Sequence, residues 1–238
     1  MTFLTQVNTA HAQDFNIESF SLFELANEQI KLGHISTKYG VGATGLSVVT
    51  SLNPKLDLSI SAGFGYHPSY TVRYLDTDLT GPIIGYALQG GVQYQIFSSP
   101  RFQVFINGNV NRNAYASDSL KGIHEAETGQ ISVNASADAT HNAAELYATF
   151  KFNTKSQIIP KFYIGAHDWS LSALGVSYRG EYKITKRAQG SNTDLLYGVG
   201  MDIPFMGNLL SLNYKCKELS ADNKVKIDSL NLQYKLNF

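Results

Sequence analysis

The last stretch of the chain alternates strictly between apolar and polar side chains. Every second residue, counted back from the end of the sequence, is apolar: Phe238, Leu236, Tyr234, Leu232 and Leu230. The residues between them are polar. A period of two places neighbouring side chains on opposite faces of a strand. The pattern therefore predicts a β-strand over residues 224–238, with one apolar face that includes the terminal phenylalanine.

The same alternation, or a run of β-branched residues and glycines, recurs along most of the chain. The clearest internal example is 56–66, where apolar residues alternate with Asp57, serines and glycines. Strands are predicted over 14–30, 38–52, 56–66, 83–97, 102–113, 144–152, 162–171, 195–205, 210–217 and 224–238. An all-β protein of about ten strands follows. Eight or twelve strands remain open, because 14–30 alternates poorly and 172–193 could form a hairpin of its own.

The segments between these strands alternate in length. Short turns are predicted at 53–55, 98–101, 154–160 and 206–208, and long polar loops at 67–82, 114–142 and 172–193, with 220–223 as a short exception. Outer-membrane β-barrels have short periplasmic turns and longer extracellular loops. The layout favours this class of protein over a secreted, soluble β-sandwich, which remains the alternative.

The C-terminal strand also resembles the recognition strand of bacterial outer-membrane β-barrel proteins of the OmpA- and OmpW-like type, which ends in an aromatic residue. The resemblance implies a closed antiparallel transmembrane barrel in a Gram-negative outer membrane, in contact with lipid and lipopolysaccharide. It also implies that the barrel-assembly machinery reads the alternate residues of this strand: Leu230, Leu232, Tyr234, Leu236 and Phe238.

Aromatic residues gather at the short-turn ends of the predicted strands. We expect them to form a girdle at the boundary between hydrocarbon and headgroups, where aromatic rings are favoured. Its members are Phe97, Phe102, Phe152, Phe162, Phe205 and Phe238. Phe97 fits less well than the others, because its neighbour Ile96 has the parity of the apolar face.

The opposite faces of the strands are rich in amides and charges. A barrel of about ten strands is narrow, so charges inside it have to pair. We expect a lumen charge network of Asp57, Glu145, Lys151, Asp202, Lys215, Lys217 and Lys235. A mostly filled lumen follows, with a structural or surface-interaction role for the long loops. A narrow channel for ions or small solutes is the alternative.

Composition narrows the remaining choices. The 238 residues carry no formal net charge and only 16% charged residues, and no basic run suggests nucleic acid as a partner. The single cysteine, Cys216, excludes an intramolecular disulfide, and we expect no metal or cofactor. We expect a monomer, with an extracellular protein or glycan as a possible loop ligand.

Two segments carry weaker signals. Ala10-His11-Ala12 has the A-x-A form cut by signal peptidase, so 1–12 is interpreted as a partial signal peptide and 13–238 as one barrel domain. His167 and Ser170 are the nearest approach to a catalytic pair, as in a lipid A-modifying enzyme. Their spacing of three places them on opposite strand faces, so we expect no enzyme activity.

Overall fold

The computed structural model describes residues 15–33, 35–37, 40–74, 77–127, 129–154, 157–179 and 182–236. Almost all of them lie in strands. The ten long strands are β1 (Phe15–Ala26), β4 (Gly40–Asn53), β5 (Leu56–Tyr74), β6 (Thr77–Ser98), β7 (Phe102–Ala126), β8 (Gly129–Phe152), β9 (Ile159–Arg179), β10 (Tyr182–Phe205), β11 (Asn208–Ser220) and β12 (Lys224–Leu236). Two three-residue strands, β2 (Ile30–Leu32) and β3 (Ile35–Thr37), lie between β1 and β4.

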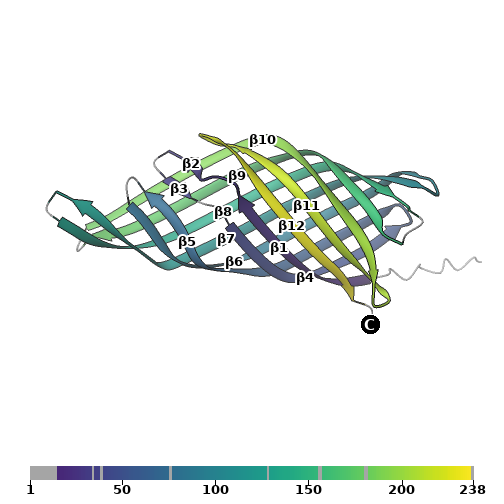
Figure 1. The fold of residues 1–238 in the computed structure, drawn as a ribbon, viewed down its shortest axis with the longest axis horizontal. Helices are drawn as coiled ribbons and strands as arrows, with labels where there is room; N and C mark the ends of the chain where they lie inside the picture. Colours follow the sequence, from purple (N-terminus) through teal and green to yellow (C-terminus); the bar gives the residue numbers. More distant parts are fainter. Residues whose placement is uncertain are drawn as a thin grey trace, which may run out of the picture.

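The long strands form one antiparallel ring. Each pairs with the next along the chain, and the first pairs with the last: β1 and β12 run together from Ile17 opposite Leu236 to Ala26 opposite Ile227. Figure 1 shows the strands side by side around one long axis. The predicted all-β fold of about ten strands is confirmed. A β-sandwich needs two sheets, whereas the described strands form a single one.

Nowhere in the described part of the chain is there a helix of the length and apolar character needed to cross a bilayer.

The prediction of three long loops is wrong. Most of 67–82, 114–142 and 172–193 continues the flanking strands, so that β5–β6, β7–β8 and β9–β10 are long hairpins. The apolar alternation disappears in these segments while the backbone pairing continues. A strand that leaves an apolar medium no longer needs an apolar outer face, but its peptide groups still need partners.

The short turns are found where the sequence places them. Asn53 accepts a hydrogen bond through Oδ1 from the backbone N–H of Lys55 at 2.9 Å, which closes the turn after β4. Met206 and Gly207 both have positive φ angles, 51° and 77°. A two-residue hairpin turn with two positive φ angles matches the twist of the strands it joins.

Several of the long strands exchange their apolar face partway along, although β1 keeps Phe23 and Leu25 exposed up to its hairpin end. In β12, Val225 and Ile227 are buried, whereas Leu230 and Leu232, on the opposite face, are exposed. The pairing of β12 with β11 runs without a bulge from Ser220 opposite Lys224 to Leu210 opposite Tyr234. The backbone is therefore regular, and what changes is which face of the strand carries the apolar side chains.

The interior is correspondingly divided in two. Toward the long hairpins it holds an apolar cluster, which includes the β2–β3 segment: Ala26, Ile30, Leu32, Ile35, Val41, Tyr70, Ile83, Tyr115, Ala143, Trp169, Leu171, Ala188, Leu219, Val225 and Ile227. A second, smaller cluster of Leu79, Leu120, Val133 and Ala135 lies inside the hairpins. Toward the short turns the interior is polar.

Candidate functional site: the polar lumen

The polar half of the interior contains a cavity of about 330 Å³, lined by residues from all ten long strands. The inward side chains are amides, hydroxyls, tyrosines and charged groups. They come from the polar faces that the sequence alternation predicts, because the outward faces of the same segments are apolar. This cavity is the candidate site of the molecule.

Glu145 on β8 is the centre of one ion-pair cluster. Its carboxylate lies 2.8 Å from the ammonium of Lys217 and 3.4 Å from that of Lys215, both on β11. Lys217 also lies 3.0 Å from the carboxylate of Glu24 on β1. Glu24, Glu145 and Lys217 are buried. The cluster therefore links β8, β11 and β1, and it spans the seam where the two ends of the chain meet.

Asp202 on β10 is the centre of a second cluster closer to the short turns. It pairs with Lys161 on β9 at 2.5 Å and with Lys151 on β8 at 3.8 Å. Ser211 on β11 donates a hydrogen bond to the same carboxylate. A buried ion pair is stabilising only when its lone pairs are well satisfied, and the two lysines and the hydroxyl meet that condition.

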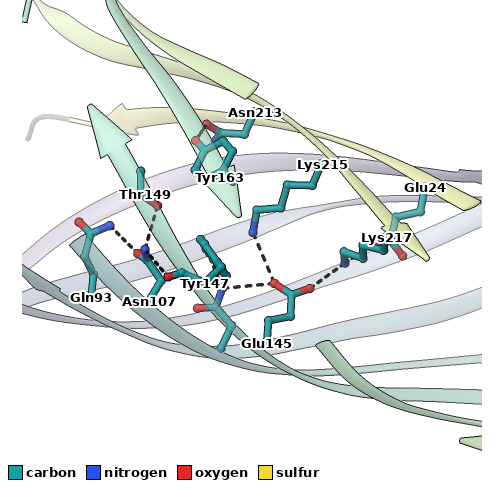
Figure 2. A network of polar contacts seen from close by, with 11 residues as sticks. Glu24, Gln93, Asn107, Glu145, Tyr147, Thr149, Tyr163, Asn213, Lys215 and Lys217 are labelled. Atoms are coloured by element: carbon teal, nitrogen blue, oxygen red, sulfur yellow. Dashed lines mark hydrogen bonds and ion pairs between the residues drawn. The ribbon is translucent and has the colours of Figure 1, made fainter. Parts of the chain in front are cut away.

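Amides, hydroxyls and tyrosines surround the Glu145 cluster, as Figure 2 shows. Asn107 donates to Thr149 Oγ1 at 2.8 Å and accepts from Gln93 at 2.7 Å. Tyr163 donates its hydroxyl hydrogen to Asn213 Oδ1. The ammonium of Lys215 lies 4.0 Å from the centre of the Tyr147 ring, a favourable cation–π distance.

Five of the predicted lumen residues take part in the two clusters: Glu145, Lys151, Asp202, Lys215 and Lys217. Asp57 lines the same cavity and accepts a hydrogen bond from Ser51 at 2.6 Å, but it forms no ion pair among the described residues. Lys235 lies on β12 opposite Glu18 of β1, at the short-turn end of the seam.

Sequence reasoning missed Glu24 and Lys161. Glu24 lies in the one strand whose alternation is disturbed, because Leu22, Phe23 and Leu25 are apolar in near succession. Lys161 was overlooked because the predicted strand began one residue later. Its parity with Tyr163 was the signal that could have placed it inside the ring.

Above the polar half, the apolar cluster fills the interior. Trp169 is 1% exposed and donates its indole N–H to Asp194 Oδ2 at 2.7 Å. Leu32 of β2 approaches Gly190 of β10 so closely that a Cβ at this glycine would lie 2.7 Å from the leucine Cδ2. The β2–β3 segment therefore packs against β10 across the interior, while β3 pairs with β5 on the other side.

The outward faces of the polar half carry the predicted aromatic residues. Phe97, Phe152, Phe162 and Phe205 are all exposed. Neighbouring rings follow one another across four strands: the ring centres of Phe97 and Phe102 are 6.1 Å apart, Phe102 and Phe152 4.9 Å, and Phe152 and Phe162 5.7 Å. A register shift between Gln95 and Phe97 lets both Ile96 and Phe97 face outward. This bulge explains the irregular parity of Phe97.

The C-terminal strand follows the same arrangement. Leu230 and Leu232 are exposed, and the Tyr234 ring packs against Phe205 at 6.2 Å. Leu236 lies opposite Ile17 of β1, and its side chain is outside the described set. Phe238 lies outside the described residues, as does the predicted signal peptide 1–12.

The candidate catalytic pair is divided between the two faces of β9. His167 is buried and points inward, where its Nε2 donates to the backbone carbonyl of Glu218 at 2.6 Å. Ser170 is exposed and accepts a hydrogen bond from Asn142 at 3.5 Å. In the described part of the chain, no three His, Cys, Asp or Glu side chains are grouped as a metal site would require.

Comparison with known proteins defines the fold. No family model and no curated protein matches the sequence. Among solved structures, the translocator domain of autotransporter NalP from Neisseria meningitidis matches with a TM-score of 0.58 at 7% identity, over 94% of this chain and 88% of that one. The chain thus shares its β-barrel fold with this translocator domain.

Two further structures of the same class match less closely in shape. OprG from Pseudomonas aeruginosa has a TM-score of 0.38 at 16% identity and covers 95% of this chain and 97% of its own. Ail from Yersinia pestis has a TM-score of 0.38 at 13% identity, with coverages of 93% and 99%.

Proposed function

We propose that the chain is a Gram-negative outer-membrane protein, with a closed ten-stranded barrel whose short turns face the periplasm. Its filled lumen acts as a scaffold that presents the β5–β6, β7–β8 and β9–β10 hairpins at the cell surface. The observation that carries this proposal is the exchange of apolar faces along several of the long strands, such as β9 and β12. An outward apolar face over polar contents requires hydrocarbon outside, and an outward polar face over apolar contents requires water outside.

The length of the outward apolar face supports the membrane placement. On β5 the exposed apolar residues run from Leu58 through Ile60 and Phe64 to Tyr66. A transmembrane strand needs about 9–11 residues, and the segment from 58 to 66 matches this span. Beyond Tyr66, the rest of β5 belongs to the hairpin that we place in water.

The contents of the lumen support a structural role. In the polar half of the interior, the Glu145 and Asp202 clusters join strands of the ring. In the apolar half, Trp169, Leu219 and Val225 are each 1% exposed. An interior occupied in this way offers no wide path for solutes. We infer that the hairpins, and not the lumen, make contact with partners, which could include lipopolysaccharide, protein or glycan.

Labelling of intact cells tests the orientation. Glu127→Cys, at the tip of β7–β8, should react with a membrane-impermeant maleimide on whole cells. Lys55→Cys, at a short turn, should react only after the outer membrane is opened. The wild-type protein controls for Cys216, which is buried. Reaction of Lys55→Cys on whole cells would overturn the orientation.

The polar cavity favours one second candidate, a narrow ion path. Its volume of about 330 Å³ and its charged lining could hold water and a small ion. Planar-bilayer recording separates the two functions. The scaffold predicts no single-channel conductance at neutral pH, and reproducible conductance steps would favour the ion path. The expected lack of enzyme activity stays a prediction, which mass spectrometry of lipid A would test.

A further inference from the structure

One strand of the ring has an unpaired edge. β10 pairs with β9 from its first residue, Tyr182 opposite Arg179, to Asp202 opposite Ile159. Its pairing with β11 begins only at Leu196, opposite Lys217. The far part of β10 therefore has a neighbour on one side, and no other described strand pairs with it on the other. In Figure 1 the β9–β10 hairpin, in green, reaches farther along the long axis than β11–β12, in yellow.

Side-chain contacts mark where the unpaired edge begins. Asp194 accepts hydrogen bonds from the backbone N–H of Ser220 at 2.8 Å and from its hydroxyl at 2.7 Å. Asn192 donates to the carbonyl of Ser220 at 3.3 Å. These bonds fasten the end of β11 to β10. The segment 182–191 lies beyond them, and we call it the β10 edge.

The β10 edge offers backbone groups to a partner. In an edge strand, alternate residues direct both their N–H and their C=O away from the sheet, where another extended chain can pair with them. At roughly 3.3 Å per residue, the edge is about 33 Å long. Its other side is paired with β9, and β8 pairs with β9 as far as Tyr178 opposite Asn134.

The charge of the edge indicates the chemistry of the partner. The sequence places Lys183, Lys186 and Arg187 on it and no acidic residue between 182 and 193. Lys186 and Arg187 are exposed and form no ion pair among the described residues. Antiparallel pairing of two copies through this edge would bring like charges together, which disfavours self-association.

We propose that the β10 edge is a docking site for an extended, acidic segment of another protein, which adds to the sheet as a further strand. Main-chain hydrogen bonds supply affinity, and Lys186 and Arg187, which lie on opposite faces of β10, select glutamate or aspartate at two adjacent positions of the incoming strand. This inference rests on the proposed surface-scaffold function, because the edge reaches a partner only if the long hairpins lie outside the cell.

The experiment uses the whole chain in detergent and a labelled, short peptide with two adjacent glutamates flanked by valines. Fluorescence anisotropy measures binding, and hydrogen exchange measures protection of residues 185–191. We expect the acidic peptide to bind and to slow exchange on the β10 edge. The same peptide with lysine in place of each glutamate should bind at least about tenfold more weakly, since each opposite-charge pair becomes a like-charge pair.

Two changes separate the backbone from the charge contribution. N-methylation of alternate residues of the peptide removes the donors on one of its edges and should abolish binding. Lys186→Glu with Arg187→Glu should weaken the acidic peptide about tenfold. Lys121→Glu, an exposed lysine on β7, is the matched control and should leave the affinity unchanged.

The proposal is overturned if the acidic peptide does not bind the wild-type barrel, if the protection falls outside β10, or if the N-methylated peptide binds equally well. Cross-linking of wild-type protein into dimers, in place of peptide binding, would also overturn it in favour of a second copy. The maleimide labelling and bilayer recording described above involve no peptide. A failure of the docking site therefore remains distinguishable from a failure of the surface scaffold.

Discussion

The two halves of β9 carry their apolar side chains on opposite faces of the strand. Near the short turns, Phe162 and Ile164 are exposed while Lys161 and Tyr163 are buried. Only a few residues farther along, Trp169 and Leu171 are buried, whereas Asp168 and Ser170 are exposed. The backbone is equally well paired in both halves. Its apolar side chains nevertheless face outward in the short-turn half and inward in the hairpin half. What differs is how each half is stabilised.

In the short-turn half, stability depends on ion pairs and hydrogen bonds between buried charged side chains, because these groups are held away from water. In the hairpin half, it depends on close packing of apolar side chains. The two halves should therefore respond differently to substitution: the short-turn half to the loss of a charge, and the hairpin half to the loss of apolar volume.

Removal of Glu145 should be the most damaging single change. Glu145→Leu leaves Lys215 and Lys217 without their shared carboxylate, and breaking a buried pair in this way costs about 3–5 kcal/mol. Urea unfolding in lipid vesicles measures the change. Glu125→Leu, an exposed carboxylate on the far hairpin, is the control and should cost less than about 0.5 kcal/mol. Equal losses would mean that the polar half does not depend on its ion pairs.

Loss of packing should dominate in the other half. Leu219 is 1% exposed, and Leu219→Ala should cost about 2–5 kcal/mol because a cavity remains in a rigid interior. Leu230→Ala removes the same atoms from the outward face, where lipid can move into the space. It should cost clearly less in the same unfolding assay. A larger loss for Leu230→Ala would contradict the assignment of lipid to that face.

A charge placed in the outward apolar band tests the medium directly. Ile60 is 73% exposed and lies in the middle of the band on β5. Ile60→Arg should destabilise the folded barrel in bilayers by about 2–4 kcal/mol. Ser170→Arg, outward on β9 but beyond the band, should be nearly neutral. Similar costs for the two arginines would indicate that water, and not hydrocarbon, surrounds both positions.

The smallest effect is expected at the tip of β5–β6. Arg73 donates two hydrogen bonds of 2.6 Å to Asp78, and they lower the pKa of this carboxyl. Because the folded pKa lies below the unfolded one, the stabilisation is present at neutral pH and is lost as the pH falls through the folded pKa. Both side chains are about half exposed, so water screens the pair. We expect less than about 0.5 kcal/mol.

Amide exchange at the tip of this hairpin, followed at neutral and acidic pH, measures the effect. The wild-type tip should exchange slightly faster in acid, after correction for intrinsic rates. Asp78→Asn should remove the pH dependence. A pH response that survives Asp78→Asn would have to come from another group.

The predictable part of the molecule is the short-turn half. The alternation of Leu230, Leu232 and Tyr234, or of the residues of 56–66, reports two faces in two media, and a strand is the only element with that period. The same parity predicts that Glu145, Lys215 and Lys217 lie on inward faces. Which of them pair was not predictable, because the pairs join β8 to β11 and β11 to β1, and depend on the register of strands far apart in the chain.

The hairpin half was misinterpreted for a physical reason. In 114–142 the outward face is polar, and much of the inward face is alanine or serine, so no apolar period marks a strand. The pairing of these residues comes from the neighbouring chain: β7 and β8 remain in register from Phe102 opposite Phe152 to Ala126 opposite Gly129, with one bulge. Backbone hydrogen bonds that cross between segments leave little trace in the local sequence.

The sequence by itself determined the class of fold, the direction in which most side chains of the short-turn half face, and the positions of the tight turns. Each of these depends on local periodicity or local φ angles. Tertiary structure alone decided the closure of β1 on β12, the partners of each buried charge, the apolar filling beneath the hairpins and the unpaired edge of β10. These features depend on which strands become neighbours and on where each one ends, and a single strand carries no information about the length of the strand beside it.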